Sequence, residues 1–126
     1  MPAYNFKPQF VEPILNKSKP HTIRMPRKNP TEAGDRIYMY TGLRTKQAKK
    51  FAESIVVAVL PIIIYSYSGF IRKDGILFKD DEVIALARND GFPSPREFFD
   101  FFIATYKTNE LNLELIEWDV DRLARC

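Results

Sequence analysis

The run IVVAVLPIII, at residues 55–64, limits the fold of this 126-residue chain more than any other segment. Its length is about half of the roughly 20 residues that a membrane-spanning helix needs, so we expect it to be buried within a globular domain. The β-branched residues favour strands, while Pro61 indicates a bulge, a bend or an edge position. We therefore predict two core strands, residues 54–60 and 62–68, in a single domain formed by residues 1–126.

Other segments carry strand and hairpin signals. Residues 21–25 and 36–41 are rich in β-branched or aromatic side chains. Residues 111–118 alternate leucine with polar side chains at first, as half-buried strands do. In residues 70–78 an Asp-Gly pair separates two apolar arms, which is typical of a β-hairpin.

Helix signals precede and follow these strands. Residues 6–17 have apolar side chains at helical spacing, interrupted by two prolines, and predict a short helix. Residues 80–91 begin with acidic side chains and end on a glycine, and Ser94 with Glu97 forms a capping-box pattern before a second helix. Five or six strands with two or three helices predict an α+β domain built on a small closed β-barrel.

Residues that form disulfides or bind metals are scarce in this chain. Cys126 is the only cysteine and His21 the only histidine, so the sequence offers no intramolecular disulfide and no classical zinc site. The first 13 residues include an acidic side chain and three prolines, and they lack the apolar core of a secretory signal. We therefore expect a cytoplasmic protein with no cofactor, no metal and no membrane partner.

Charge is unevenly distributed along the chain. Residues 1–50 contain eleven Lys and Arg against three Asp and Glu, whereas residues 51–126 contain eight against thirteen. Clustered cations attract phosphate, so the basic half favours nucleic acid or a phosphorylated ligand as the partner. Alternatively, the basic half is a solvated surface that the acidic half balances after folding. The candidate phosphate-binding residues are Arg27, Lys28, Arg44, Lys46, Lys49 and Lys50.

A short basic motif follows the first predicted helix. The segment KPHTIR, residues 19–24, resembles the pattern G-x-K-x-x-E-x-R of the ASCH domain family, a branch of the PUA-like barrels. Lys19 and Arg24 match that pattern. Lys17 stands at its glycine position and Thr22 at its glutamate position.

Further elements are similar to the family in the same order, GDRIY at residues 34–38 and NDGF at residues 89–92. With Thr22, the motif looks most like a subgroup of small ASCH proteins described as N4-acetylcytidine amidohydrolases. The resemblance implies a PUA-like barrel with a nucleic-acid-directed function, the binding of RNA or a modified nucleoside. The implied cleft is lined by Lys19, Thr22, Arg24 and Asp90.

An alternative that the resemblance implies is hydrolysis of N4-acetylcytidine. Lys19 would then be the base and Thr22 the nucleophile, with Asp90 at the position of the subgroup's glutamate. A threonine hydroxyl needs a base to accept its proton, and a lysine serves only when burial or nearby cations lower its pKa. Asp90 is one methylene shorter than glutamate, and a displacement of roughly 1 Å can lower a rate about a hundredfold. Ribonuclease activity and protein docking through the acidic half are further alternatives.

The same residues also have purely structural interpretations. Lys19 and Arg24 can clamp a phosphate or a carboxylate without catalysis. Thr22 can be an ordinary β-branched strand residue, and Asp90 can cap a turn. On a regular strand Thr22 and Arg24 share one face, so His21 lies on the opposite face, where we expect a structural or surface role.

Overall fold

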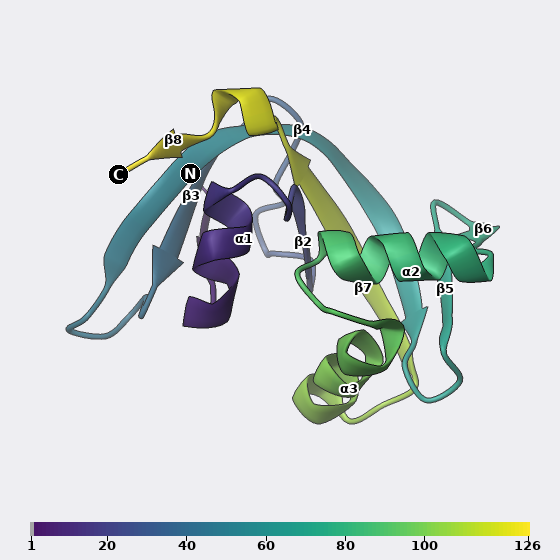
Figure 1. Ribbon diagram of the computed structural model, residues 1–126. Helices are drawn as coiled ribbons and strands as arrows, with labels where there is room; N and C mark the ends of the chain where they lie inside the picture. The colour runs from purple at the N-terminus through teal and green to yellow at the C-terminus, as the bar shows by residue number, and fades with distance from the viewer. Residues whose placement is uncertain (1) are drawn as a thin grey trace.

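The computed structural model describes residues 2–126, which form a curved mixed β-sheet with helices packed against one side (Figure 1). The strands are β1 (Ala3–Asn5), β2 (His21–Arg24), β3 (Arg36–Thr41), β4 (Lys49–Tyr65), β5 (Phe70–Lys73), β6 (Ile76–Leu77), β7 (Glu110–Trp118) and β8 (Ala124–Arg125). The helices are α1 (Val11–Leu15), α2 (Asp80–Asn89) and α3 (Pro95–Tyr106), with the 3-10 turns η1 (Pro8–Phe10) and η2 (Val120–Arg122). The predicted α+β class is confirmed, and the sheet has eight strands where we expected five or six.

The long strand β4 arches across the top of the molecule and connects two groups of strands (Figure 1). Its first half pairs with β3 and β8, and its second half pairs with β5 and β7. At the ends of the sheet, β1 lies parallel to β3, β6 pairs with β5, and β2 pairs with β7. These outer strands are two to four residues long, and no pairing within residues 2–126 joins them to one another. The sheet is therefore open, in place of the closed barrel that the sequence led us to expect.

Pro61 lies inside a continuous strand, where the sequence predicted a break between two strands. Its carbonyl accepts a hydrogen bond from the Asp74 backbone N–H, at the hairpin turn just beyond the end of β5. In an antiparallel ladder the N–H and C=O groups of one residue face the same edge, so the N–H that proline lacks would also face this turn. The ladder between β4 and β7, on the other edge of Pro61, is therefore unaffected. The register shifts of β4 lie instead between Val56 and Ala58, where it pairs with β7, and between Lys50 and Ala52, where it pairs with β3.

The connection from α2 to α3 brings the predicted motif residues to the sheet. Asp90 is the C-cap of α2, and Gly91 follows with a φ of +96°, a left-handed conformation that favours glycine. A Cβ atom at Gly91 would lie 2.9 Å from the Phe10 ring, so the chain passes close to η1 at this point. The predicted cap of α3 is confirmed, since Ser94 Oγ accepts a hydrogen bond from the Glu97 backbone N–H.

Candidate functional site

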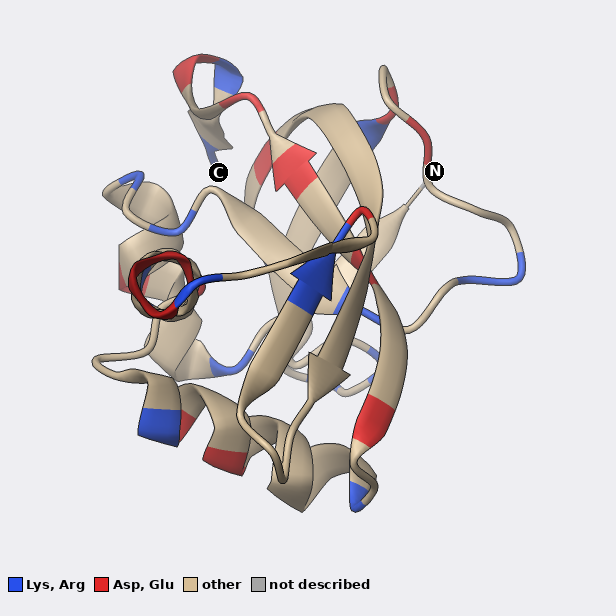
Figure 2. Ribbon diagram, turned by 90° about the vertical axis from the view of Figure 1, so that its right-hand side faces the viewer, with Lys and Arg blue, Asp and Glu red and all other residues tan. Residues whose placement is uncertain are grey.

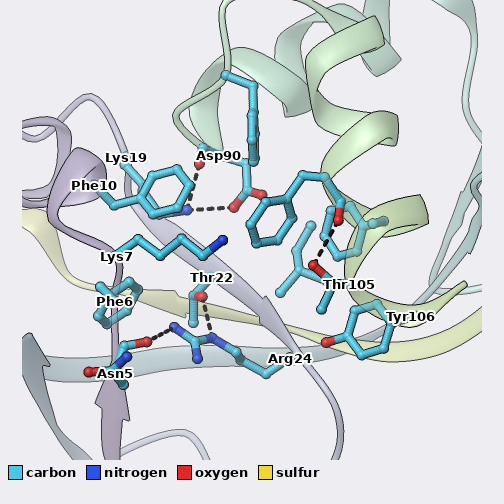
Figure 3. Close-up of a pocket in the computed structure, with 14 residues that line it drawn as sticks. Asn5, Phe6, Lys7, Phe10, Lys19, Thr22, Arg24, Asp90, Thr105 and Tyr106 are labelled. Atoms are coloured by element: carbon cyan, nitrogen blue, oxygen red, sulfur yellow. Dashed lines mark hydrogen bonds and ion pairs between the residues drawn. The ribbon is translucent and has the colours of Figure 1, made fainter. Parts of the chain in front are cut away.

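A pocket of about 210 Å³ lies where η1, β2 and the α2–α3 connection meet (Figure 3). We call it the inner pocket. Its polar lining includes Lys7, Lys19, Thr22, Arg24 and Asp90, and its apolar walls include Phe10, Phe92, Phe101 and Tyr106. The structure therefore brings together the four residues that the sequence analysis assigned to one cleft.

Lys19 and Asp90 form a buried ion pair at one side of the inner pocket. The Lys19 Nζ atom donates to the Asp90 carboxylate at 2.7 Å and to the Asp90 carbonyl at 2.6 Å, and it lies 4.8 Å from the centre of the Phe10 ring. Burial lowers the pKa of Lys19, although the Asp90 carboxylate acts in the opposite direction. Burial alone would raise the pKa of Asp90, but Lys19 and His21 outweigh it and hold that pKa below its ordinary value.

His21 contacts the same carboxylate. Its Nε2 atom lies 3.2 Å from Asp90 Oδ1, and the side chain is buried. The buried position excludes a surface role, which was one of the two roles expected for His21. The alternation of a strand does not reveal that His21 contacts Asp90, which caps a helix far along the chain.

Thr22 and Arg24 form a second polar pair, on the same face of β2 as predicted. The Arg24 Nε–H donates to Thr22 Oγ1 at 2.9 Å, and an Nη2–H donates to the Asn5 carbonyl at 2.5 Å. The guanidinium also lies 4.7 Å from the centre of the Phe6 ring. Burial lowers the pKa of Arg24 while Tyr106 and Asp90 oppose this, and an arginine so placed remains charged near neutral pH.

The hydrogen bonds of Lys19 and Thr22 show whether the two residues are paired as a base and a nucleophile. The Lys19 ammonium donates to Asp90, and the Thr22 hydroxyl accepts from Arg24. No hydrogen bond connects the Lys19 amine to the Thr22 hydroxyl in the described part of the chain. A base that activates a nucleophile must lie within hydrogen-bond reach of it, directly or through one water. The inner pocket therefore contains several polar side chains without a formed base–nucleophile pair.

A second, wider hollow of about 400 Å³ adjoins the inner pocket, and we call it the outer hollow. Its lining contains three arginines, Arg24, Arg27 and Arg44, and no acidic side chain. Arg24 and Asn5 line both spaces, so the two are neighbours.

The other predicted phosphate ligands lie outside both spaces. Lys28, Lys46 and Lys49 are exposed, and neither lining includes them. Lys50 donates to Glu53 at 3.0 Å, and this hydrogen bond raises the pKa of Lys50. The structure thus brings Arg24, Arg27 and Arg44 together but leaves the four lysines apart from them.

Polar residues of the inner pocket that the sequence analysis missed include Asn5, Lys7 and Tyr106. Figure 3 shows the Lys7 side chain reaching between Lys19 on one side and Thr22 on the other. Burial raises the pKa of Tyr106, so its hydroxyl keeps its proton and can donate a hydrogen bond. None of the three belongs to a motif, and only the folded chain shows that they converge.

Figure 2 shows both basic and acidic residues on the side of the molecule that faces the viewer. This side is therefore not formed by the basic half of the sequence alone. Within residues 2–126, no helix is long and apolar enough to cross a membrane. The same residues contain no group of three or more His, Cys, Asp or Glu side chains placed to hold a metal ion.

The fold and site together define a small α+β domain with a buried ion pair in an aromatic, cation-lined pocket. The chain matches no family model, and comparison with curated proteins and with solved structures finds no match either.

Proposed function

We propose that this protein is an ASCH-like, nucleic-acid-directed domain that holds a single base, as part of RNA or of a modified nucleoside, in the inner pocket. The observation that carries the proposal is the convergence of Lys7, Lys19, Thr22 and Arg24 with several aromatic rings around one small space. The likeness of residues 19–24 to the ASCH motif supports it, and kinship with the PUA-like barrels is part of the same proposal.

The size and walls of the inner pocket favour a small flat ligand. Pockets for drug-sized molecules usually measure roughly 300–1,000 Å³, and this one measures about 210 Å³. Phe10, Phe101 and Tyr106 supply ring surfaces, and stacking on an aromatic ring contributes roughly 1–3 kcal/mol per base. A single base is a flat, polar-edged ring of the kind that such walls accommodate.

The polar groups of the inner pocket suit the edge of a base. Asp90 is already bound by Lys19, so the carboxylate does not present an unpaired negative charge to the ligand. The Lys7 ammonium and the Tyr106 hydroxyl are donors, and the Thr22 hydroxyl can still donate its own proton while it accepts from Arg24. This set of donors matches the carbonyl oxygens and ring nitrogens that bases offer as acceptors.

Isothermal titration with adenosine, cytidine, guanosine, uridine, N4-acetylcytidine and short single-stranded RNAs tests this proposal. Thr105 lines the inner pocket from an exposed position on α3, so Thr105→Trp should fill the pocket and weaken binding at least tenfold. Ala104→Trp adds the same ring to the exposed position beside it, outside the lining, and should leave binding unchanged. Absence of binding to every probe, or equal binding by both variants, would exclude the inner pocket as a base site.

Hydrolysis of N4-acetylcytidine is a second candidate, favoured by one observation. Lys19, Thr22 and Asp90 line the same pocket, and burial lowers the pKa of Lys19 in the direction that a lysine base needs. Purified protein incubated with N4-acetylcytidine should then release acetate, and Thr22→Ala should abolish the release. Thr22→Ser keeps a hydroxyl and should retain part of it. No release of acetate over several hours, with the nucleoside bound, would leave the binding function alone.

A further inference from the structure

The outer hollow is lined by three arginines, whereas the inner pocket is lined by one. Arg24 and Arg27 lie against the same ring, with their Cζ atoms 5.4 Å and 5.1 Å from the centre of Tyr4. The Tyr4 hydroxyl is hydrogen-bonded to Thr31 Oγ1 at 2.6 Å, which ties this ring to the loop that carries Arg27. Arg44 reaches the same hollow from the turn between β3 and β4. Three arginines from three segments therefore line one space.

The backbone of β1 orients two of these arginines. β1 is an end strand that pairs only with β3 among the described residues, so its other edge has free carbonyls. The Asn5 carbonyl accepts from Arg24 and the Ala3 carbonyl accepts from Arg27, at 2.5 Å and 3.3 Å. Residues two apart in a strand face the same way, so both guanidinium groups lie along one edge.

Most of the donors in this cluster are still available for a ligand. Each guanidinium carries five N–H groups, of which Arg24 uses one at Thr22 and one at Asn5, and Arg27 uses one at Ala3. Arg44 makes no side-chain hydrogen bond or ion pair within residues 2–126. No acidic side chain lines the outer hollow to neutralise the three charges. Planar N–H forks without a protein carboxylate suit the oxygens of a phosphate group.

We propose that the outer hollow is a phosphate subsite formed by Arg24, Arg27 and Arg44, and that the ligand is a nucleotide whose base occupies the inner pocket. This inference rests on the proposed function, because it takes the inner pocket as the base site. Arg24 and Asn5 line both spaces, so a phosphate in one lies next to a base in the other. The phosphate ester belongs either to a free mononucleotide or to an RNA strand, and the two share this chemistry.

Titration calorimetry with matched ligands and matched variants tests the subsite. The probes are each nucleoside of the panel above, its 5′- and 3′-monophosphates, and an eight-nucleotide single-stranded RNA. Arg27→Ala/Arg44→Ala removes two charges from the outer hollow. Arg96→Ala/Arg122→Ala removes two arginines whose side chains are 88% and 70% exposed and which line neither space, so it is the control for net charge. Arg44→Ala alone is measured as well, in case the double variant does not fold. Arg44 makes none of the polar side-chain contacts that Arg27 makes, so its removal should leave the fold intact.

The wild-type protein should bind a monophosphate or the RNA at least tenfold more tightly than the nucleoside. Arg27→Ala/Arg44→Ala should remove this advantage and leave nucleoside binding intact, while the control pair keeps it. With RNA, the slope of log affinity against log salt should fall by about 0.7 for each arginine lost. A gain with the monophosphate that RNA does not share identifies a mononucleotide, and a larger gain with RNA identifies a strand.

The results distinguish a failure of the phosphate subsite from a failure of the base pocket. Equal binding of nucleoside, monophosphate and RNA, or an advantage that survives Arg27→Ala/Arg44→Ala, overturns the phosphate subsite and leaves the base pocket standing. Binding of neither nucleoside nor nucleotide overturns both.

Discussion

The inner pocket and the outer hollow share Arg24, yet their charged groups differ in how far they are paired within the fold. In the inner pocket the Lys19 ammonium is buried and bound twice by Asp90, with His21 close to the same carboxylate. In the outer hollow Arg27 and Arg44 leave most of their donors unused. Buried charges must be satisfied within the fold, whereas charges at an open surface are solvated and remain available. The comparison predicts that inner-pocket changes affect stability first and that outer-hollow changes affect binding alone.

Asp90→Asn should have the largest effect on stability. It leaves the buried Lys19 ammonium without its counter-charge, and breaking a buried pair from one side costs about 3–5 kcal/mol. Urea unfolding followed by circular dichroism measures this loss. Asp100→Asn is the control, since its side chain is 64% exposed and 3.9 Å from Arg96, and it should change stability by less than about 0.5 kcal/mol. The double variant Lys19→Met/Asp90→Asn should recover part of the loss, and additive effects would contradict a coupled pair.

The stabilisation from Asp90 should also disappear in acid. Because its pKa is lower in the folded chain than in the unfolded chain, the unfolded state takes up the proton first as pH falls. The contribution is therefore fully present above about pH 5 and is lost below about pH 4, through the folded pKa. Unfolding of the wild type and of Asp90→Asn at pH 7, 5, 4 and 3 should show stabilities that converge in acid. A difference that stays constant across this range would mean that the carboxylate charge is not what stabilises the pocket.

Gly91→Ala should be the next most costly change. The residue has a φ of +96°, and a Cβ atom would lie 2.9 Å from the Phe10 ring, so strain and steric overlap act together. We expect a loss of about 2–3 kcal/mol, from the same urea measurement. Gly34→Ala is a close control, because Gly34 has a φ of +95° but nothing within 4 Å of the added Cβ. Equal losses at the two glycines would show that the contact between the α2–α3 connection and η1 contributes nothing.

Local signals in the sequence predicted much of the fold. The cap at Ser94, the acidic start of α2 and the Asp-Gly hairpin turn each depend on residues within one turn of one another, and all three appear in the structure. The spacing of Thr22 and Arg24 on a strand gave their shared face in the same way. Short-range geometry is therefore recoverable from this sequence by simple rules.

Long-range arrangement was harder to predict. Lys19 and Asp90 are 71 residues apart, and their pairing could be anticipated only through a resemblance to a family motif. Whether a sheet closes depends on the length and direction of its outer strands, and apolar patterning does not specify these. Charge counts could not separate Arg27 and Arg44 from Lys46 and Lys49, because the folded chain makes that selection in space. The backbone edge of β1 and the Tyr4 ring place Arg27, and the turn between β3 and β4 places Arg44.

Thr22→Ala tests the link between the two spaces. It removes the acceptor of the Arg24 Nε–H inside the inner pocket, and an unsatisfied buried donor costs about 1–2 kcal/mol. Thr22→Ser keeps the oxygen and should restore most of the stability in urea unfolding. If serine and alanine are equally destabilising, the methyl group of Thr22 contributes more than its hydroxyl.

Arg44→Ala should have the smallest effect on stability, within about 0.5 kcal/mol of the wild type, because the side chain is exposed and makes no polar contact within residues 2–126. Thermal unfolding alongside Asp90→Asn makes the contrast direct. Arg44 lines the outer hollow with two other arginines and no acidic side chain, so its removal relieves charge repulsion and should leave the melting temperature equal or slightly higher. A large loss of stability in Arg44→Ala would instead show that the outer hollow is part of the folded framework, as the inner pocket is.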